Sequence, residues 1–481
     1  MTSRLTALLL AVAACCSQAA ESAKPNVIFI LADDLGIGDL GCYGQQKIHT
    51  PNIDRIAAEG LRFTQHYCGN CVCAPSRCTL MTGLHCGHAP IRDNMQRGPS
   101  EEGQRPMPAG TRTVAQLLHD AGYFTGIIGK WGLGMPEDHS SPRDFGFDYS
   151  YGYLCQAVAH TYYPPYLWRN NERETLAGNP PYDVSMKGVI EPKGEIYAHD
   201  LMANDALQFV RDHRAKPFFL YLAFTIPHLS LQVPEDSMAE YQGQWTETPF
   251  RNTKHYANNE TPRAAYAGMI TRMDKDIGRL MALLKDLGLD DNTLVFFSSD
   301  NGAVFPLAGT DPVFFHSTGG FRGYKQDLYE GGIHTPFIAR WPGRIKAGAI
   351  TDHVSAFWDF LPTMAELTGT PAPANTDGIS YLPTLLGRQQ KEHEFLYWEY
   401  YSGGGRVAVR LGDWKAVANG IKKDPHAPLE VYKLDSDPTE SHDLAAENPG
   451  IVARAREIIA HEHFPSPVKE WNFDASLPVT R

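Results

Sequence analysis

The sequence is short of positive charge. Its 43 Lys and Arg residues are outnumbered by 55 Asp and Glu residues, which gives a formal net charge of -12. A protein that binds nucleic acid through the phosphate backbone needs a basic face, so this balance argues against a nucleic-acid partner. An anionic small substrate is not excluded, because a pocket can be basic inside an acidic protein.

Long apolar runs are lacking after the first residues, so we expect no membrane span. The run at residues 5–14 is too short to cross a bilayer and is typical of a secretory signal peptide at residues 1–20. In a second interpretation, residues 12–15 resemble a bacterial lipobox, in which Cys15 is lipidated. Both interpretations predict an exported protein, periplasmic or secreted, and the second adds a lipid anchor at the outer membrane.

The cysteine spacing of a zinc ribbon is also missing. Nine cysteines are present, but no second C-x-x-C pair follows the first at the usual distance. Two of the nine, Cys15 and Cys16, lie in the predicted leader. In an exported protein some of the others could pair as disulfides, and their odd number leaves at least one unpaired or otherwise used.

What the sequence does contain is an alternation of strand and helix patterns. With 43% hydrophobic and 11% aromatic residues, the chain can build a sizeable core. Strands are expected at residues 26–32, 123–128, 217–224, 293–298 and 337–340, and helices at 52–60, 112–121, 200–213 and 263–287. This alternation predicts an α/β fold with a mostly parallel sheet, which we assign to residues 21–385.

The pattern changes after about residue 385. Short strands separated by Gly and Asp turns are expected at residues 395–401, 407–411, 414–417 and 429–434, followed by a helix at about 450–462. We therefore predict a smaller α+β subdomain at residues 386–481, built on an antiparallel sheet.

Acidic residues follow two of the predicted strands. Asp33 and Asp34 come directly after the first strand, and Asp300 and Asn301 follow a late one. Sites in open α/β sheets form outside the carboxyl ends of strands, and carboxylate and amide oxygens are ligands for Ca²⁺ or Mg²⁺. Each pair could instead cap a helix or turn. Because the pairs stand at matching strand ends, we favour a metal site, with Ca²⁺ before Mg²⁺.

Residues 73–83 read CAPSRCTLMTG, and the pattern C-x-P-S-R-x-x-L-x-T-G resembles the signature of the formylglycine-dependent sulfatases. Other motifs that resemble this family follow in order: GKWGLG at 129–134, PH at 227–228, SDNG at 299–302, RGYK at 322–325, EGG at 330–332 and GDWK at 412–415. The resemblance covers roughly residues 25–450.

This resemblance implies an alkaline-phosphatase-like fold and an arylsulfatase-like sulfuric ester hydrolase. It implies that a maturation enzyme oxidises Cys73 to Cα-formylglycine, whose hydrated gem-diol attacks sulfur and later releases sulfate by elimination. The implied metal ligands are Asp33, Asp34, Cys73, Asp300 and Asn301.

The chemistry explains the other residue types. A sulfate ester is a tetrahedral anion with a poor alkoxide leaving group, so its hydrolysis needs cations for the sulfuryl oxygens and an acid for the leaving oxygen. By the resemblance, Lys130 and Lys325 hold the sulfate oxygens. Arg77 orients the gem-diol, and His228 protonates the departing sugar oxygen.

One position departs from the family pattern. Gly132 stands where the family has a histidine that helps to deprotonate the gem-diol. Either the protein is an inactive, sulfoglycan-binding pseudoenzyme, or a base is recruited from elsewhere. We favour recruitment because the other motifs are intact, with His88, His160 and His316 as the candidates.

Residues 150–170 are dense in Tyr and Trp and contain two prolines. This favours a stiff loop on which a sugar ring could stack, although ordinary core packing would use the same residues. His160 would hydrogen-bond a sugar hydroxyl, and His316 and Arg322 are weaker candidates for the same role. We therefore predict a sulfated saccharide as substrate, with a phosphonate or phosphodiester hydrolase of the same superfamily as the alternative.

Overall fold

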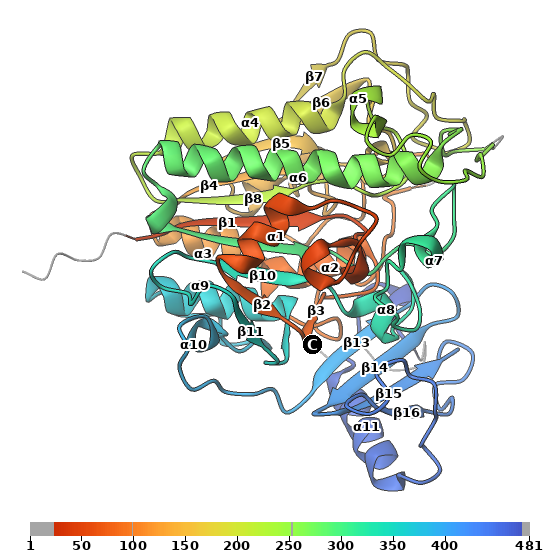
Figure 1. Ribbon diagram of the computed structural model, residues 1–481. Helices are drawn as coiled ribbons and strands as arrows, with labels where there is room; N and C mark the ends of the chain where they lie inside the picture. Colours follow the sequence, from red (N-terminus) through yellow and green to blue (C-terminus); the bar gives the residue numbers. More distant parts are fainter. Residues whose placement is uncertain (1–23, 99, 252–253, 474–481) are drawn as a thin grey trace, which may run out of the picture.

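A ten-stranded sheet forms the centre of the molecule (Figure 1). The computed structural model describes residues 24–473 apart from 99 and 252–253, so the predicted signal peptide and lipobox lie outside the described residues. Across the sheet the strands are β11 (Ala349–Thr351), β2 (Leu61–Phe63), β10 (Phe337–Arg340), β9 (Thr293–Ser299), β1 (Asn26–Ala32), β8 (Phe218–Ala223), β4 (Phe124–Lys130), β5 (Tyr149–Tyr153), β6 (Tyr166–Arg169) and β7 (Glu172–Thr175).

The middle of this sheet is parallel. Strand β1 pairs in parallel with β8 on one side and β9 on the other, and β4 pairs in parallel with β8 and β5. Every residue of β1 and β9 is buried, as expected for parallel strands covered on both faces. Ala32 is aligned with Ser299, so the residues that follow β1 and β9 emerge side by side.

Helices cover both faces of the sheet. On one face α1 (Pro51–Ala58) and α4 (Ala198–His213) contact the long helix α6 (Pro262–Asp286), and α4 and α6 lie along the top of Figure 1. On the other face α2 (Cys73–Thr82), α3 (Val114–Asp120) and α9 (Phe360–Thr368) contact one another. The Phe29 ring of β1 packs against Phe360 of α9 at 4.8 Å between ring centroids, which anchors this second layer.

A second sheet lies at the C-terminal end, in blue in Figure 1. It is antiparallel and consists of β13 (Leu396–Tyr400), β14 (Arg406–Leu411), β15 (Trp414–Asn419) and β16 (Glu430–Lys433), with α11 (Pro449–Glu462) packed on β14 and β15. The predicted fold class, a mostly parallel sheet with a separate antiparallel sheet, is confirmed. Smaller elements are β3 (His66–Tyr67), β12 (Ser355–Ala356), α5 (Glu235–Met238), α7 (Pro312–Phe315), α8 (Glu330–Ile333) and α10 (Leu382–Leu385).

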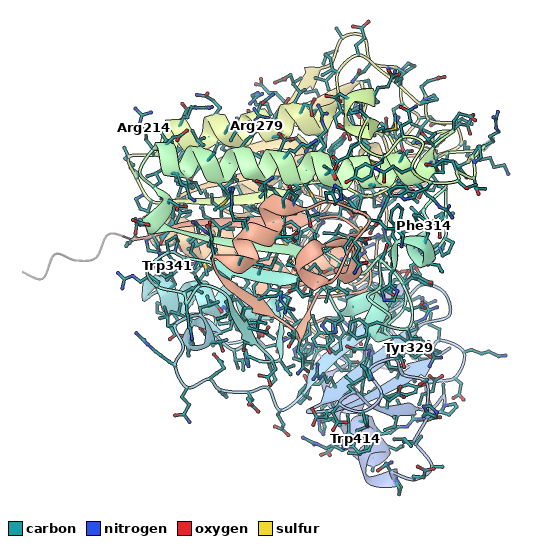
Figure 2. The ribbon with its side chains drawn as sticks, in the orientation of Figure 1. Arg214, Arg279, Phe314, Tyr329, Trp341 and Trp414 are labelled. Atoms are coloured by element: carbon teal, nitrogen blue, oxygen red, sulfur yellow. The ribbon has the colours of Figure 1, made fainter. Side chains whose placement is uncertain are left out.

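Buried ion pairs join the C-terminal sheet to the rest of the protein. The Lys415 ammonium of β15 lies 2.8 Å from a Glu330 carboxylate oxygen at the start of α8 and 2.9 Å from one of Glu440. The Tyr329 hydroxyl donates to a Glu430 oxygen of β16 at 2.7 Å across the same junction, near the Tyr329 label in Figure 2. The small sheet is therefore fastened to the segment that carries α8.

The prediction of a stiff aromatic loop at residues 150–170 is wrong. The segment contains β5, a short helical turn at Val158–His160 and β6, and Tyr151, Tyr153, Tyr162 and Trp168 are buried. Aromatic side chains fit a pleated, half-buried surface, so the same composition also favours strands. These rings belong to the core and form no wall for a sugar.

The cysteines from Cys42 to Cys155 are all free thiols in the part of the chain that the structure describes, so no disulfide joins them there. Within the same residues, no helix is both long enough and apolar enough to cross a membrane.

Candidate active site

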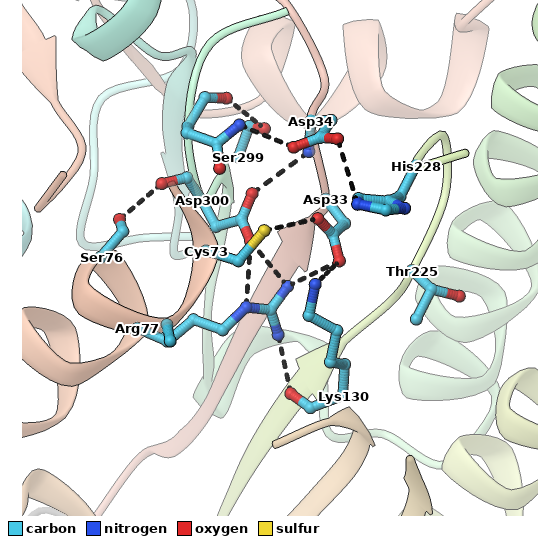
Figure 3. A network of polar contacts seen from close by, with 12 residues as sticks. Asp33, Asp34, Cys73, Ser76, Arg77, Lys130, Thr225, His228, Ser299 and Asp300 are labelled. Carbon is cyan, nitrogen blue, oxygen red and sulfur yellow. Dashed lines mark hydrogen bonds and ion pairs between the residues drawn. The ribbon is translucent and has the colours of Figure 1, made fainter. Parts of the chain in front are cut away.

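Four polar residues meet where β1 and β9 end (Figure 3). The backbone N–H of Asp300 donates to the Ala32 carbonyl at 3.1 Å, and the N–H of Asp34 donates to Asp300 Oδ1 at 3.1 Å. Asp33, Asp34, Asp300 and Asn301 are all buried. The parallel pairing of the two strands thus brings together the acidic residues that the sequence predicts as metal ligands.

Cys73 is the first residue of α2 and faces this acidic cluster. Its Sγ lies 3.4 Å from Asp33 Oδ1 and 3.6 Å from the Lys325 Nζ, and the residue is only 1% exposed. The helix is tied to β9 because the Ser76 hydroxyl donates to the Asp300 carbonyl. The N-terminus of a helix offers unpaired N–H groups and a partial positive charge, so Cys73 stands at a position that favours anions.

Three cations neutralise the acidic residues. Arg77 Nε donates to Asp300 Oδ2 at 3.0 Å, and the Lys130 Nζ pairs with Asp33 Oδ2. The Lys325 Nζ lies 2.7 Å from Asp34 Oδ1. These cations are buried as well, so the opposite charges face one another away from bulk solvent.

Burial and charge act in opposite directions on these acids. Burial by itself would raise the pKa of Asp33, but the neighbouring Lys130 above all holds that pKa well below its ordinary value. Burial raises the pKa of Asp34, and the Lys325 charge opposes that rise. Burial also raises the pKa of the Cys73 thiol, and the Asp300 and Asp33 charges add to it, so a thiolate is disfavoured here even though Cys73 stands at a helix N-terminus.

The donor set fits a divalent cation such as Ca²⁺ or Mg²⁺. Asn301 Nδ2 donates to Asp34 Oδ1 at 2.7 Å and to the Gly302 carbonyl at 2.9 Å, which fixes the orientation of the amide. Asn301 Oδ1 is then left buried without a hydrogen-bond partner among the described residues. An orphaned amide oxygen beside three carboxylates is what an oxygen-ligated cation would use.

His228 follows β8 and reaches the same cluster. Its Nδ1 lies 2.6 Å from the Leu229 carbonyl, to which it donates, so Nε2 is the atom that faces the site, 3.5 Å from Asp34 Oδ2. Burial, with help from the Lys325 charge, lowers the pKa of His228 to about 3. The resting ring is therefore neutral, with its Nε2 lone pair directed at the acidic residues.

Gly132 has a neighbour that the sequence does not predict. Its φ of 71° lies in the left-handed region, and a Cβ added there would come within 2.8 Å of Gln156 Nε2 and 3.0 Å of Gln156 Cγ. Gln156 is 6% exposed, and within the described residues its Nε2 has no hydrogen-bond partner. A carboxamide thus fills the space beside Gly132, and it cannot act as a base at neutral pH.

Among the candidates for the missing base, His160 lies beside the site. Its ring stacks on that of His228 with 4.9 Å between centroids and 16° between planes. A further histidine, His255, places its Nε2 2.6 Å from His160 Nδ1. His255 lies in a loop without periodicity, so no sequence pattern points to it.

The structure places the remaining candidates elsewhere. His88 Nδ1 lies 2.9 Å from an Asp377 carboxylate oxygen, and His316 is an exposed residue that directly follows α7. Arg322 donates to the Tyr432 hydroxyl and the Glu440 carbonyl, both at 2.8 Å, so its guanidinium is held by the C-terminal part of the chain. These contacts do not bring His88, His316 or Arg322 together with Cys73.

Known proteins resemble the chain over most of its length. Residues 25–370 match the family model Sulfatase, and residues 320–457 match the model N-sulphoglucosamine sulphohydrolase, C-terminal. Human arylsulfatase A is 33% identical, covering 94% of this chain and 88% of that protein. Dog N-acetylgalactosamine-6-sulfatase is 33% identical, covering 85% of this chain and 74% of that protein.

A solved structure agrees with these relatives. The crystal structure of Ps i-CgsB in complex with k-i-k-neocarrahexaose is 28% identical and has a TM-score of 0.76, covering 91% of this chain and 93% of that chain. The sequence motifs, the family model, the relatives and the fold agree. The chain therefore belongs to the sulfatase family, whose members hydrolyse sulfuric esters.

Proposed function

We propose that this sulfatase removes sulfate from a sulfated carbohydrate. The reaction would use an oxygen nucleophile derived from Cys73, together with a bound divalent cation. The observation that carries this proposal is the meeting of Cys73 with three carboxylates, three cations and His228 at one sheet edge. The carbohydrate is supported by the names of the relatives, which include an N-acetylgalactosamine-6-sulfatase.

Cys73 is the position that the nucleophile would occupy. A formylglycine made there by a maturation enzyme would supply, once hydrated, a hydroxyl group for attack on sulfur. Arg77 Nη1 donates to the Lys130 carbonyl at 2.7 Å, and its Nε holds Asp300, so the guanidinium keeps the start of α2 against β4 and β9. That bracing fixes where the nucleophile stands relative to the acidic cluster.

Asp33, Asp34, Asp300 and Asn301 would hold the cation, together with the side chain at position 73. When bound, such a cation lowers the pKa of a hydroxyl group and neutralises developing negative charge. Ca²⁺ is favoured, with Mg²⁺ as the alternative, since every other ligand is an oxygen atom.

The lysines and His228 would act on the substrate itself. Lys130 lies against Asp33, and Lys325 lies against Asp34 and Cys73, so both ammonium groups are placed to hold the sulfuryl oxygens of an anionic ester. Nδ1 of His228 is committed to the Leu229 carbonyl, so Nε2, unprotonated in the resting ring, is the atom that would take up a proton when the anionic ester binds and pass it to the leaving oxygen. His160, stacked on His228, would contact the sugar that carries that oxygen.

Export completes the proposal. The apolar run at residues 5–14 supports a signal peptide at residues 1–20, and the sequence at residues 12–15 supports lipidation as a variant of the same route. N-terminal analysis of the mature protein distinguishes a cleaved chain from one that begins at a lipidated Cys15.

Two measurements test the function. Mass spectrometry of the peptide that carries Cys73 should show an aldehyde, in which oxygen has replaced sulfur and two hydrogens are lost. Turnover should then be compared on N-acetylgalactosamine 6-sulfate, carrageenan oligosaccharides and 4-nitrophenyl sulfate, with 4-nitrophenyl phosphate and a phosphodiester beside them. Preference for the phosphorus substrates would favour the phosphonate or phosphodiester hydrolase.

The controls are two cysteine variants. Cys73→Ala defines the background, and turnover no higher than this background would identify a pseudoenzyme. Cys78→Ala removes a second buried thiol from the same helix and should keep activity, since Cys78 makes no contact with the acidic cluster among the described residues.

A further inference from the structure

Three histidine rings form a row that leads away from the acidic cluster. The His160 ring lies parallel to His228 at 4.9 Å, and the His255 ring meets His160 at 4.8 Å with 68° between planes. His160 Nδ1 and His255 Nε2 are 2.6 Å apart, which requires one proton between the two nitrogens. His255 is therefore linked to the ring that stacks on His228.

The backbone holds this row in place. The N–H and the hydroxyl of Ser230 both donate to the His160 carbonyl at 3.0 Å. The same hydroxyl oxygen accepts from the Ala257 N–H at 3.0 Å, two residues after His255. One serine thus fixes the loops that carry all three histidines, so their rings keep a defined mutual geometry.

Beyond the row lies a cavity. His255 pairs with the segment at residues 188–190 through Ile190 N–H to His255 carbonyl at 2.6 Å and His255 N–H to Gly188 carbonyl at 3.0 Å. That segment, with Thr161 and Tyr163, lines a cavity of about 390 Å³. This volume lies in the range of small-molecule sites. None of the three histidines lines the cavity, so the backbone pairing of His255 with residues 188–190 is what connects it to the row.

The position of the shared proton follows from the far side of His255. Its Nδ1 is buried and has no hydrogen-bond partner in the part of the chain that the structure describes. If His160 Nδ1 carried the shared proton, the proton of a neutral His255 would sit on this Nδ1 as a buried N–H without an acceptor. If His255 Nε2 carries it, Nδ1 is only an unused lone pair, and an orphaned acceptor is tolerated better than an orphaned donor.

We propose that His255 is a positioning residue that fixes His160 as the Nε2–H tautomer, so that His160 donates a hydrogen bond to a sugar oxygen next to the scissile sulfate. This inference rests on the proposed carbohydrate substrate. The His160 ring lies parallel to that of His228, with 4.9 Å between centroids, so a donor on its edge lies close to the group proposed to protonate the leaving oxygen.

Two variants of His255 test the role. His255 has a φ of 63°, a left-handed conformation that asparagine tolerates, so His255→Asn keeps the backbone while its shorter amide withdraws from His160. For the carbohydrate substrate of highest turnover, kcat/KM should fall about 5- to 30-fold, the loss expected when one hydrogen bond is misdirected. Turnover of 4-nitrophenyl sulfate should change less than about twofold, because it has no sugar oxygen to contact. His255→Gln, whose Nε2 can still donate, should restore most of the loss.

A spectroscopic measurement tests the tautomer without any substrate. In protein labelled with nitrogen-15 at histidine, and assigned with His160→Gln, the shifts should show a protonated Nε2 and an unprotonated Nδ1 on His160. The pattern should change in His255→Asn and persist in His255→Gln.

The inference is overturned if His160 carries its proton on Nδ1, or if His255→Asn lowers both kinds of turnover equally or neither. A protein that hydrolyses no sulfated saccharide would overturn the proposed substrate instead, and the nitrogen shifts would still decide on His255.

Discussion

Restoring the family histidine at position 132 should destabilise this protein, although the same residue suits its relatives. The backbone of Gly132 has a φ of 71°, where a residue with a Cβ costs about 1–2 kcal/mol more than glycine. The added Cβ would also come within 2.8 Å of Gln156 Nε2, so the carboxamide must move. That movement breaks no side-chain hydrogen bond of Nε2 with the described residues, and the backbone strain should dominate in Gly132→Ala.

An imidazole at position 132 needs more space than the methyl group of alanine. It needs the volume that Gln156 now fills, so Gly132→His should be destabilised beyond the Gly132→Ala variant, by about 1–3 kcal/mol for overpacking. Combining Gly132→His with Gln156→Ala should remove that second contribution and return the free energy of unfolding close to the Gly132→Ala value. Equilibrium urea unfolding of the two single variants, Gln156→Ala and the double variant measures the coupling.

If Gly132→His is as stable as the natural protein, or if Gln156→Ala does not relieve it, then Gln156 does not occupy the space beside position 132. Turnover of the double variant adds a separate answer. A rise above the natural protein would show that the missing histidine limits the reaction, and no rise would support a base from another part of the site.

The remaining predictions concern the site and its support. Cys73→Ala should lower turnover by about 1,000-fold or more while leaving the unfolding midpoint within a few degrees, and near-native turnover would exclude Cys73 as the nucleophile precursor. Chelation should abolish activity and Ca²⁺ or Mg²⁺ should restore it, with Asn301→Ala lowering the bound metal in elemental analysis; zinc bound by the cysteines would contradict this. His228→Ala should slow sulfated saccharides about 100-fold or more but affect 4-nitrophenyl sulfate far less, because a phenolate leaves without an acid, and equal losses would refute the acid role. Lys415→Met should cost about 3–5 kcal/mol in urea unfolding, because it removes the ammonium that two buried carboxylates share, and a loss below about 1 kcal/mol would show that these ion pairs contribute little.

The parallel sheet could be predicted because its strands are short apolar runs with polar residues at their ends. The sequence expectation of residues 26–32 coincides with β1, and the predicted ligands Asp33 and Asp300 follow paired strands. The aromatic stretch at residues 150–170 was misleading, since Tyr and Trp serve a buried strand as well as a binding surface.

Tertiary contacts between loops have no comparable pattern in the sequence from which they could be predicted. His255 meets His160 because its loop pairs with residues 188–190, a contact that no local pattern encodes. Gln156 opposes Gly132 because β5 continues alongside β4, where Gly132 N–H donates to the Leu154 carbonyl at 3.1 Å. Site residues at strand ends can therefore be predicted from the sequence, whereas those that folded loops bring next to them cannot.

The burial of Cys73 limits the time during which another enzyme can reach this residue. All residues of α2 are buried in the finished fold, so an enzyme that modifies Cys73 needs a chain in which α2 has not yet docked. Docking involves the Ser76 hydroxyl and the Asp300 carbonyl, which are 224 residues apart in sequence. At a synthesis rate of about 5–20 residues per second, the ribosome needs roughly 10–45 s to cover that distance. If Cys73 is oxidised to formylglycine as proposed, this interval is when the maturation enzyme can reach it, and a change in translation speed should then change the fraction of converted enzyme.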